Sequence, residues 1–369
     1  MWQIIENPSW ENIRTSFDWI QDMEGVPQSP IYHAEGDVAI HTKMVLEALL
    51  ALEEYQQLEG QSQAILFAAA LLHDVEKRST TVIEDDGQIT SKGHAKRGAL
   101  TARALLYRQH KTPFIIKEQI SNLVRYHGLP FWIFEKPSPE KALFQASLQV
   151  NTHWLYILAK ADMLGRICPD KENMLYKLEL FRAFCEEHDC YGKVKSFTSD
   201  FGRYTYFRKD IASPNYLPYE EDCFEVLLLS ALPGTGKDTF LRKQYPDLPV
   251  VSIDALRRKH KIAPTNKKGN GQMVQRAKEQ AREYLRKRQS FAWNATNITR
   301  NMRTQMIDLF QTYGAKTTLV YLEVPYTQLL TQNRNRAYPI PRLVLEKMVS
   351  KIEIPSLSEA PKVLYNIVK

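Results

Sequence analysis

An apolar run that leads into a glycine-rich turn constrains the fold of this chain more than any other feature. Residues 226–229 read Val-Leu-Leu-Leu, and residues 230–239 read Ser-Ala-Leu-Pro-Gly-Thr-Gly-Lys-Asp-Thr. A strand, a glycine turn and a helix start in this order let backbone N–H groups surround a phosphate, while a lysine reaches its oxygens. The segment therefore predicts a phosphate-binding loop beside a parallel sheet.

The flanking sequence supports a sheet of this kind. Short apolar runs alternate with helical patterns: the runs lie at 226–229, 249–253, 290–293 and 317–322, and the helical patterns at 237–245, 272–289, 300–313, 326–334 and 341–351. Alternating strands and helices indicate a parallel sheet that is covered by helices on both faces. We expect an α/β domain here.

The N-terminal part has helical periodicity almost throughout. Apolar residues recur at helical spacing in six segments: 40–60, 62–76, 96–109, 115–127, 143–165 and 172–188. Glycine and proline then interrupt an aromatic stretch, which we interpret as a connector that packs on one neighbour. The prediction is a multidomain chain with an all-α domain at 1–190, a connector at 191–222 and an α/β kinase-type domain at 223–369.

Charge separates the same two parts. The first 222 residues carry seven more acidic than basic side chains, whereas the remainder carries 14 more basic than acidic ones. A basic domain of this strength favours a polyanionic ligand. Eight of the nine histidines lie in the acidic part, which favours a metal site there. Four scattered cysteines, no long apolar run and no signal-peptide pattern predict a cytoplasmic protein with no membrane partner.

The phosphate loop departs from the common pattern G-x-x-x-x-G-K-[ST] at two positions. Ala231 replaces the first glycine, a mild change if its φ is negative, and Asp238 stands where a hydroxyl normally meets Mg²⁺. Either the Asp238 carboxylate contacts the metal, directly or through a water, or the hydroxyl of Thr239 does. The residues expected to bind ATP or another nucleoside triphosphate with Mg²⁺ are Gly234, Thr235, Gly236, Lys237, Asp238 and Thr239.

Asp254 follows the next apolar run and is the candidate general base. The carboxyl ends of parallel strands meet at one crevice, so its carboxylate should face the phosphate loop and accept a hydroxyl proton. Arg257, one turn later, is expected to bind a phosphate. Arg336 and Arg334 are candidates for contacting the donor phosphates, and Arg336 fits the register better.

Histidines and aspartates in the N-terminal part form an ordered set of candidate metal ligands. A His-Asp dyad, His73-Asp74, ends an apolar run, and the segment H-x-E-G-D-V-x-x-H-T starts at His33. This set resembles the HD phosphohydrolase superfamily over about residues 28–170. The resemblance implies an all-α HD fold with one metal on His41, His73, Asp74 and Asp162, and a second metal completed by His94 and His127.

Residue spacing leaves one alternative open at this site, and ligand chemistry indicates which metals suit it. His33 is a further candidate, and spacing does not decide whether His33 or His41 reaches the metal. Imidazole-rich ligation favours two transition metals such as Mn²⁺, Fe²⁺, Ni²⁺, Co²⁺ or Zn²⁺ over Mg²⁺. Two such cations can bind a phosphate and activate a water. Lys77 and Arg166, one turn beyond Asp74 and Asp162, are expected to bind phosphate oxygens.

The C-terminal part resembles phage-type polynucleotide 5′-kinases. The likeness covers about residues 224–350 and lies in the phosphate loop, the D-x-x-R segment at Asp254, the turn at 294–297 and the arginines near 336. The whole chain resembles bacterial HD-domain polynucleotide kinases. The family implies removal of 2′,3′-cyclic, 2′- or 3′-phosphates, phosphorylation of a 5′-OH from an NTP, DNA or RNA ends as partners, and a functional link to a ligase.

Two other functions fit the same motifs. One is a nucleoside or small-molecule kinase fused to an HD nucleotidase, although the basic surplus argues against it. The other is a non-catalytic nucleotide-dependent switch in which the HD site senses a ligand. Phosphate transfer to a 5′-OH oligonucleotide, and the effect of Asp254→Asn, distinguish these from end healing.

Overall fold

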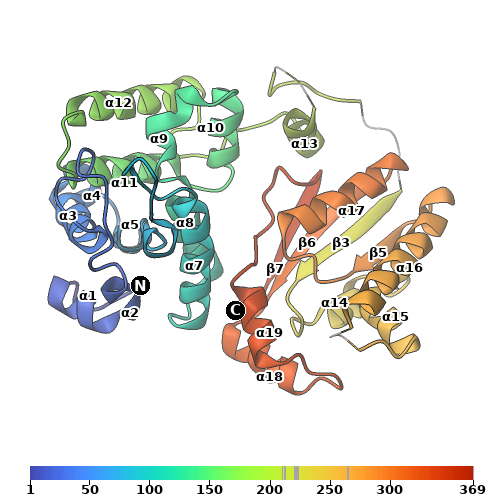
Figure 1. The fold of residues 1–369 in the computed structure, drawn as a ribbon. Coiled ribbons are helices and arrows are strands. Elements are labelled where there is room, and N and C mark those ends of the chain that lie inside the picture. The colour runs from blue at the N-terminus through green and yellow to red at the C-terminus, as the bar shows by residue number, and fades with distance from the viewer. Residues whose placement is uncertain (210, 212, 220–223, 264–265, 369) are drawn as a thin grey trace. The chain divides into compact units, whose positions relative to one another are not determined.

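The chain folds into two compact units, Met1–Ser196 and Phe197–Lys369 (Figure 1). The computed structural model describes residues 1–209, 211, 213–219, 224–263 and 266–368, and each unit is described by itself. The expected start of the second domain, residue 223, lies outside the described residues. The residues just before the unit boundary pack within the first unit, because the Lys195 amide donates a hydrogen bond to Ser147 Oγ. None of the helices described here is long and apolar enough to cross a membrane.

The first unit is a helical bundle with one small hairpin. Its elements are α1 (Trp10–Ser16), α2 (Asp18–Gln21), α3 (Val38–Ala51), α4 (Glu53–Gln56), α5 (Gly60–Leu72), α6 (Lys77–Thr80), β1 (Val82–Ile83), β2 (Ile89–Thr90), α7 (His94–Arg108), α8 (Phe114–Tyr126), α9 (Leu129–Trp132), η1 (Ile133–Glu135), α10 (Pro139–Ser147), α11 (Thr152–Leu164) and α12 (Lys171–Glu187). The all-α prediction is confirmed apart from the hairpin, which turns at residues 85–87.

Helix α5 is the centre of this bundle. Every residue from Ile65 to Leu72 is buried, because α3, α8 and α11 pack around it. A helix that is apolar on all sides is stable only when neighbours cover all of it. Since α5 ends at Leu72, the dyad that follows it starts inside the bundle instead of at the surface.

The single helix expected over 143–165 is in fact two helices. Helix α10 ends at Ser147, and α11 begins after Asn151, whose side chain accepts hydrogen bonds from the amides of His153 and Trp154. Asparagine is a strong N-cap because its side-chain oxygen satisfies amides that have no partner within the helix. Leu148 and Val150 are buried in the turn. Their apolar character continued the helical pattern and hid the break.

The second unit is an α/β domain with a five-stranded parallel sheet in the order β4-β5-β3-β6-β7. Its elements are α13 (Asp200–Arg208), β3 (Glu225–Ala231), α14 (Lys237–Gln244), β4 (Val250–Ser252), α15 (Ile253–Lys259), α16 (Lys267–Arg286), β5 (Phe291–Asn294), α17 (Arg300–Thr312), β6 (Lys316–Glu323), α18 (Tyr326–Arg334), α19 (Arg342–Val349) and β7 (Lys362–Ile367). The expected α/β fold with a parallel sheet is confirmed.

The central strand β3 is buried on both faces. Val226 and Leu228 contribute to a core that includes residues of α16 and α17, while Leu227 and Leu229 join Leu241 of α14 in the other core. Alternate residues of a strand point to opposite faces, so a continuous apolar run is what a doubly covered strand needs. Tyr204 of α13 belongs to the first of these cores, which anchors α13 to the second unit.

Strand β7 and the buried ion pair before it were not predicted. β7 is an edge strand with half-buried and exposed residues, so its apolar signal is weak. The guanidinium of Arg303, which is fully buried, donates to both carboxylate oxygens of Glu359 at 2.7 and 3.0 Å. This pair connects α17 to the segment that leads into β7, and no local pattern links residues so far apart in the sequence.

Candidate functional sites: a histidine-aspartate cluster and a phosphate loop

Asp74 lies at the centre of a cluster in the first unit. One carboxylate oxygen, Oδ2, is 3.3 Å from His73 Nε2 and 3.7 Å from His41 Nε2. The other oxygen, Oδ1, is 3.4 Å from His94 Nε2 and 3.8 Å from His127 Nε2. Asp74 thus joins two groups of potential ligands, each of which contains two histidines.

The cluster draws its members from distant parts of the bundle. His41 lies in α3, His73 and Asp74 follow α5, His94 begins α7, and His127 follows α8. Asp162, in α11, completes the first group, because its Oδ1 is 3.2 Å from His41 Nε2. The structure therefore brings together the six residues that the HD resemblance assigned to two metals.

The imidazole rings are oriented by hydrogen bonds on their outer nitrogens. The Nδ1 atoms of His73, His94 and His127 lie 2.7, 2.8 and 2.8 Å from the carbonyl oxygens of residues 70, 91 and 124. An Nδ1 that donates to a carbonyl leaves Nε2 with a free lone pair. Each Nε2 then faces another one, at 3.4 Å between His41 and His73 and at 3.3 Å between His94 and His127. Facing lone pairs repel unless a cation lies between them.

The donor set fits divalent metal ions. Both carboxylate oxygens of Asp74 are buried, and among the described residues Oδ1 accepts no hydrogen bond. Imidazole nitrogens and carboxylates are the ligands that first-row transition metals favour. His41 and Asp74, with His73, would hold one ion, and Asp74 with His94 and His127 would hold the second.

The side chains of Lys77 and Arg166 balance the charge of the two aspartates. Lys77 Nζ is 2.7 Å from Asp74 Oδ2 and donates to Gln28 Oε1 at 2.7 Å. Arg166 donates to both oxygens of Asp162, at 2.9 and 2.5 Å. Burial opposes ionisation of Asp74, yet the Lys77 ammonium holds the pKa of its carboxyl well below the usual range. The Arg166 guanidinium has the same effect on the pKa of Asp162.

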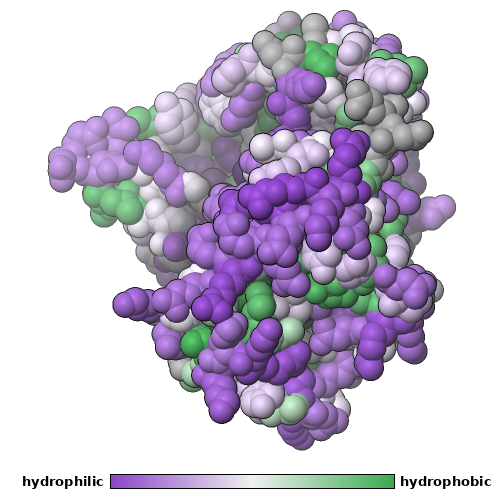
Figure 2. Space-filling model, turned by 90° about the vertical axis from the view of Figure 1, so that its right-hand side faces the viewer, coloured by the Kyte–Doolittle hydropathy of each residue, from purple (hydrophilic) through white to green (hydrophobic). Residues whose placement is uncertain are grey.

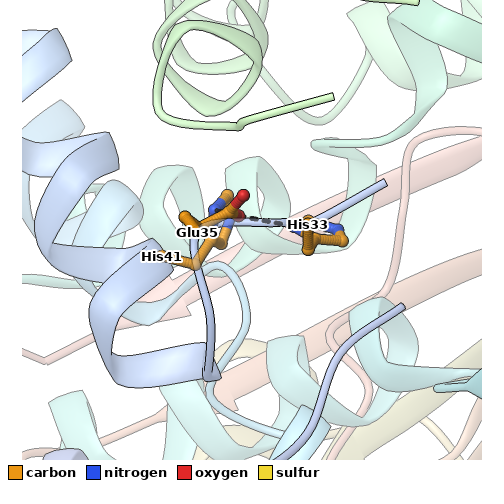
Figure 3. Close-up of side chains that lie close together, drawn as sticks. All are labelled: His33, Glu35 and His41. Atoms are coloured by element: carbon orange, nitrogen blue, oxygen red, sulfur yellow. Dashed lines mark hydrogen bonds and ion pairs between the residues drawn. The ribbon is translucent and has the colours of Figure 1, made fainter. Parts of the chain in front are cut away.

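His33 occupies a different place from the other candidates. Its Nδ1 is 2.8 Å from Glu35 Oε1, and the same oxygen lies 2.9 Å from His41 Nδ1 (Figure 3). The structure thus places His41 at Asp74 and Asp162, and His33 behind it, across Glu35. Sequence reasoning missed Glu35, although the spacing H-x-E places an acid two residues after His33.

Glu35 contacts both the ring of His41 and the backbone of Ile167. Its side chain is fully buried, and its second oxygen accepts from the Ile167 amide at 2.8 Å. Burial raises the pKa of this carboxyl, but hydrogen bonds from His33 and His41 lower the pKa by more, so the net change is downward. An ionised Glu35 holds Nδ1–H of His41, and this arrangement directs Nε2 toward the cluster.

The phosphate loop connects β3 to α14 in the second unit. Gly234 and Gly236 have φ of 91° and 86°, values that favour glycine, whereas Ala231 is not among the residues with positive φ. Alanine therefore replaces the usual first glycine without strain. The turn after β5 braces the loop: the Ala231 amide donates to the Thr296 carbonyl at 2.9 Å, and Asn297 Nδ2 donates to the Leu229 carbonyl at 2.7 Å.

Lys237 begins α14 and folds back over the loop. Its Nζ donates to the carbonyls of Leu232 and Ala231 at 2.9 and 3.3 Å. Burial lowers the pKa of Lys237 to about 8, with Arg336 acting in the same direction and Asp254 in the opposite one. Carbonyl oxygens hold the ammonium group where the phosphates of a nucleotide are expected to bind.

Asp254 and two arginines face this loop across a cavity of about 1360 Å³. Arg257 Nη2 lies 2.5 Å from Asp254 Oδ1, and Arg336 Nη2 lies 3.6 Å from Oδ2. Helix α15 is capped by Ser252, which accepts from the Ala255 amide, so Asp254 does not serve as the cap. The side chain of Asp254 is 49% exposed and available to a ligand.

The lining of the cavity shows which of the remaining candidate residues lie at the site. All six residues of the expected nucleotide loop line it, as do Asp254 and the two arginines beside it. The lining includes Gly234, Thr235, Gly236, Lys237, Asp238, Thr239, Asp254, Arg257 and Arg336. Arg334 is exposed at the end of α18 and is not among the lining residues. The structure thus places Arg336, and not Arg334, at the site. Arg258 and Lys261 also line the cavity and were not singled out from the sequence.

Two family models match the chain, one in each unit. Residues 38–162 match the family model described as HD domain, and residues 226–355 match the model described as AAA domain. Residues 38–162 therefore form an HD domain, and residues 226–355 form a domain with a P-loop kinase-type fold. The HD domain implies divalent metal ions, and the P-loop domain implies a nucleoside triphosphate with Mg²⁺.

Individual relatives cover less of the chain. The Multifunctional CCA protein of Halorhodospira halophila is 35% identical over 103 residues, which span 28% of this chain and 22% of that protein. The chain therefore covers about a fifth of that relative's length. A crystal structure described as a "putative kinase" from Chloroflexus aurantiacus has 17% identity, a TM-score of 0.33, and coverage of 40% of this chain and 89% of its own.

Proposed function

We propose that this protein heals the ends of broken nucleic acids with two active sites. The P-loop kinase-like domain transfers the γ-phosphate of an NTP to a 5′-OH, and the HD domain removes phosphate from the 2′,3′ end. The observation that carries the proposal is the position of Asp254: its carboxylate faces Lys237 across the cavity that the phosphate loop lines.

The kinase step follows from these charges. Lys237 and the loop amides hold the donor phosphates, and Mg²⁺ when bound neutralises part of their charge. The acceptor oxygen attacks the γ-phosphorus while Asp254 takes the hydroxyl proton, and the bond to the nucleoside diphosphate breaks. Arg336, which is 3.6 Å from Asp254, is placed to stabilise the negative charge on the transferred group.

The HD site supports hydrolysis of a phosphoester. A pair of metal ions supplies Lewis acidity and an activated water there. His41 and His73 with Asp74 would hold one ion, His94 and His127 with Asp74 would hold the other, and Lys77 and Arg166 add positive charge beside the two aspartates. The site therefore suits a terminal or cyclic phosphate, which is a compact anion that two cations bind well.

A polynucleotide acceptor is favoured by the surface around the kinase cavity. Arg258 and Lys261 extend positive charge from Asp254, and Arg276 of α16 donates to the neighbouring His260 at 2.8 Å. The face of the second unit that carries α16 is mainly hydrophilic (Figure 2), and its exposed cations on α16 include Lys268, Arg276 and Arg286. Such a surface suits backbone phosphates better than a small neutral acceptor.

The test is a choice of acceptor. The full-length protein is incubated with γ-labelled ATP, Mg²⁺ and either a 5′-OH oligonucleotide or a free nucleoside at equal concentration. We expect label on the oligonucleotide, at least about a hundredfold faster than on the nucleoside, and a rate that falls steeply with salt. Preferred labelling of the nucleoside would support a small-molecule kinase instead, and no transfer to either would support a switch.

A further inference from the structure

Asp238 is the one residue of the phosphate loop whose chemistry opposes the ligand. It is the second residue of α14, at a position where the common loop has a neutral hydroxyl, and it lines the same cavity as Lys237 and Gly236. A carboxylate at this place repels the phosphates that the loop amides and Lys237 attract. The repulsion becomes an attraction only if a cation lies between the carboxylate and the phosphates.

The structure holds this carboxylate in a fixed orientation. Asn294, at the end of β5, donates from Nδ2 to Asp238 Oδ1 at 2.6 Å. Asn294 is itself buried and lines the cavity, so the amide restrains Asp238 from the neighbouring strand. With Oδ1 engaged by Asn294, Oδ2 is the oxygen that a ligand can use. A hard anionic oxygen is a donor that Mg²⁺ prefers.

Thr239 is less suited to the same role. Its Oγ1 lies 3.5 Å from Nη2 of Arg242 on the same helix, so the hydroxyl faces a cation of the protein. A guanidinium beside the hydroxyl disfavours a second cation at that oxygen. Asp238, which stands at the usual Ser/Thr position, has one oxygen, Oδ2, for which no hydrogen bond is described, whereas the hydroxyl of the following Thr239 contacts Arg242.

We propose that Asp238, oriented by Asn294, is a direct anionic ligand of the divalent cation that accompanies the nucleotide, and that it makes nucleotide binding depend on that cation. Without the cation, Asp238 acts as a barrier to free NTP. The inference rests on the nucleotide-binding part of the proposed function and is independent of the acceptor. A failure to phosphorylate polynucleotides would therefore leave it untouched.

The experiment measures binding and not turnover. Affinity of the full-length protein for a non-hydrolysable ATP analogue is determined by calorimetry, with EDTA and with saturating Mg²⁺, for wild type, Asp238→Asn and Thr239→Val. Wild type is expected to gain at least about tenfold in affinity with Mg²⁺. In EDTA, Asp238→Asn should bind the analogue about fivefold more tightly than wild type, because the repulsion is gone, and it should lose most of the Mg²⁺ gain.

The tighter binding expected of Asp238→Asn in EDTA separates this role from a merely structural one. A damaged loop would bind the analogue more weakly both in EDTA and in Mg²⁺. The HD domain is common to all three proteins, so its metals cancel in the comparison. Thr239→Val should keep the cation dependence of wild type. The proposal is overturned if Asp238→Asn binds like wild type in EDTA and in Mg²⁺, if it binds more weakly in EDTA, or if Thr239→Val is the variant that loses the Mg²⁺ gain.

Discussion

The HD site and the kinase site differ in how far the protein alone assembles them. In the HD domain, His41, His73 and Asp162 are fully buried, and hydrogen bonds to backbone carbonyls orient most rings. In the kinase-like domain, the side chains of Asp254 and Arg336 are 49% and 28% exposed and face an open cavity. In the HD domain, the fold alone buries and orients the candidate metal ligands. In the second domain, the charged side chains stay partly exposed, and we expect a bound nucleotide to order them.

This difference has a physical cause in each domain. Buried carboxylates need compensation, so the HD cluster includes Lys77 and Arg166 as counter-charges at 2.7 and 2.5 Å. Under the proposed function, the cavity of the second unit must admit a nucleotide and its acceptor and then release the products. Its cations therefore stay solvated until the ligand arrives, and a partly exposed charge contributes to ligand binding more than to stability.

The largest effect is expected at the residue that joins the two metal groups. Asp74→Ala should lower phosphoesterase activity at least about a thousandfold, because both ions lose the shared carboxylate. Kinase activity should stay within about twofold. Release of phosphate from a 3′-phosphate oligonucleotide with Mn²⁺ and label transfer from ATP measure the two activities on the same preparation.

His153→Ala is the matched control for Asp74→Ala. His153 lies in the same domain, in the first turn of α11, and its ring packs on Tyr191 away from the cluster. It should retain phosphoesterase activity. If Asp74→Ala weakened both activities equally, the two sites would not be independent.

A smaller loss is expected at Asp254, since Lys237 and the loop still bind the donor. Asp254→Asn should reduce kinase activity by about a hundredfold to a thousandfold, while the affinity for ATP changes by less than about threefold. Asp247→Asn, which changes an exposed acid outside the cavity, should behave like wild type. Retained transfer by Asp254→Asn would remove this residue from catalysis.

The two arginines near the lid give a comparison within one segment. Arg336→Ala should slow transfer by about thirtyfold, because a cation 3.6 Å from Asp254 is lost. Arg334→Ala should change it by less than about twofold, since Arg334 lies outside the cavity lining. Steady-state rates of both variants at saturating ATP test the assignment, and equal losses would contradict it.

The smallest effect concerns pH. Burial lowers the pKa of Lys237 from its ordinary 10.5 to about 8, so the folded domain releases this proton at a lower pH than the unfolded chain. Nucleotide needs the protonated amine, so ATP affinity should fall by about tenfold between pH 7 and pH 9. Lys237→Arg should show no such fall. Proton uptake on ATP binding near pH 8.5, measured by calorimetry in two buffers, gives the same answer independently.

The same lowered pKa also sets a stability trend with a definite sign. Between about pH 8 and 10.5 the unfolded chain holds the Lys237 proton while the folded domain has released it. The unfolded state then binds more protons, so this group makes the free energy of unfolding rise with pH in that window. Below pH 8 the buried ammonium lowers stability.

The sequence was most informative where function depends on short, contiguous motifs. The phosphate loop and the dyad at His73 were recognisable because a strand, a turn and a helix end fix them locally. The carbonyl acceptors of residues 70, 91 and 124 were not, because backbone oxygens leave no mark in a sequence. Glu35 was missed although its side chain is visible in the sequence, because only the fold brings it between His33 and His41. The choice of His41 over His33 at the cluster depends on tertiary packing.

Three features of the fold were missed for equally physical reasons. Strand β7 is half exposed, so its pattern lacks the continuous apolar run of β3. The break between α10 and α11 was hidden because Leu148 and Val150 are buried in the turn. The pair of Arg303 and Glu359 is set by the approach of α17 to a distant segment. Burial decides all three, and local periodicity does not report it.

Analysis of both ends of one strand tests the central claim most directly. An oligonucleotide with a 5′-OH and a 3′-phosphate is incubated with Mn²⁺, Mg²⁺ and ATP, and its products are resolved by mass. Wild type should yield 5′-phosphate and 3′-OH on the same molecule, Asp74→Ala only the new 5′-phosphate, and Asp254→Asn only the new 3′-OH. If both ends of the strand are unchanged after incubation with wild type, the account is contradicted.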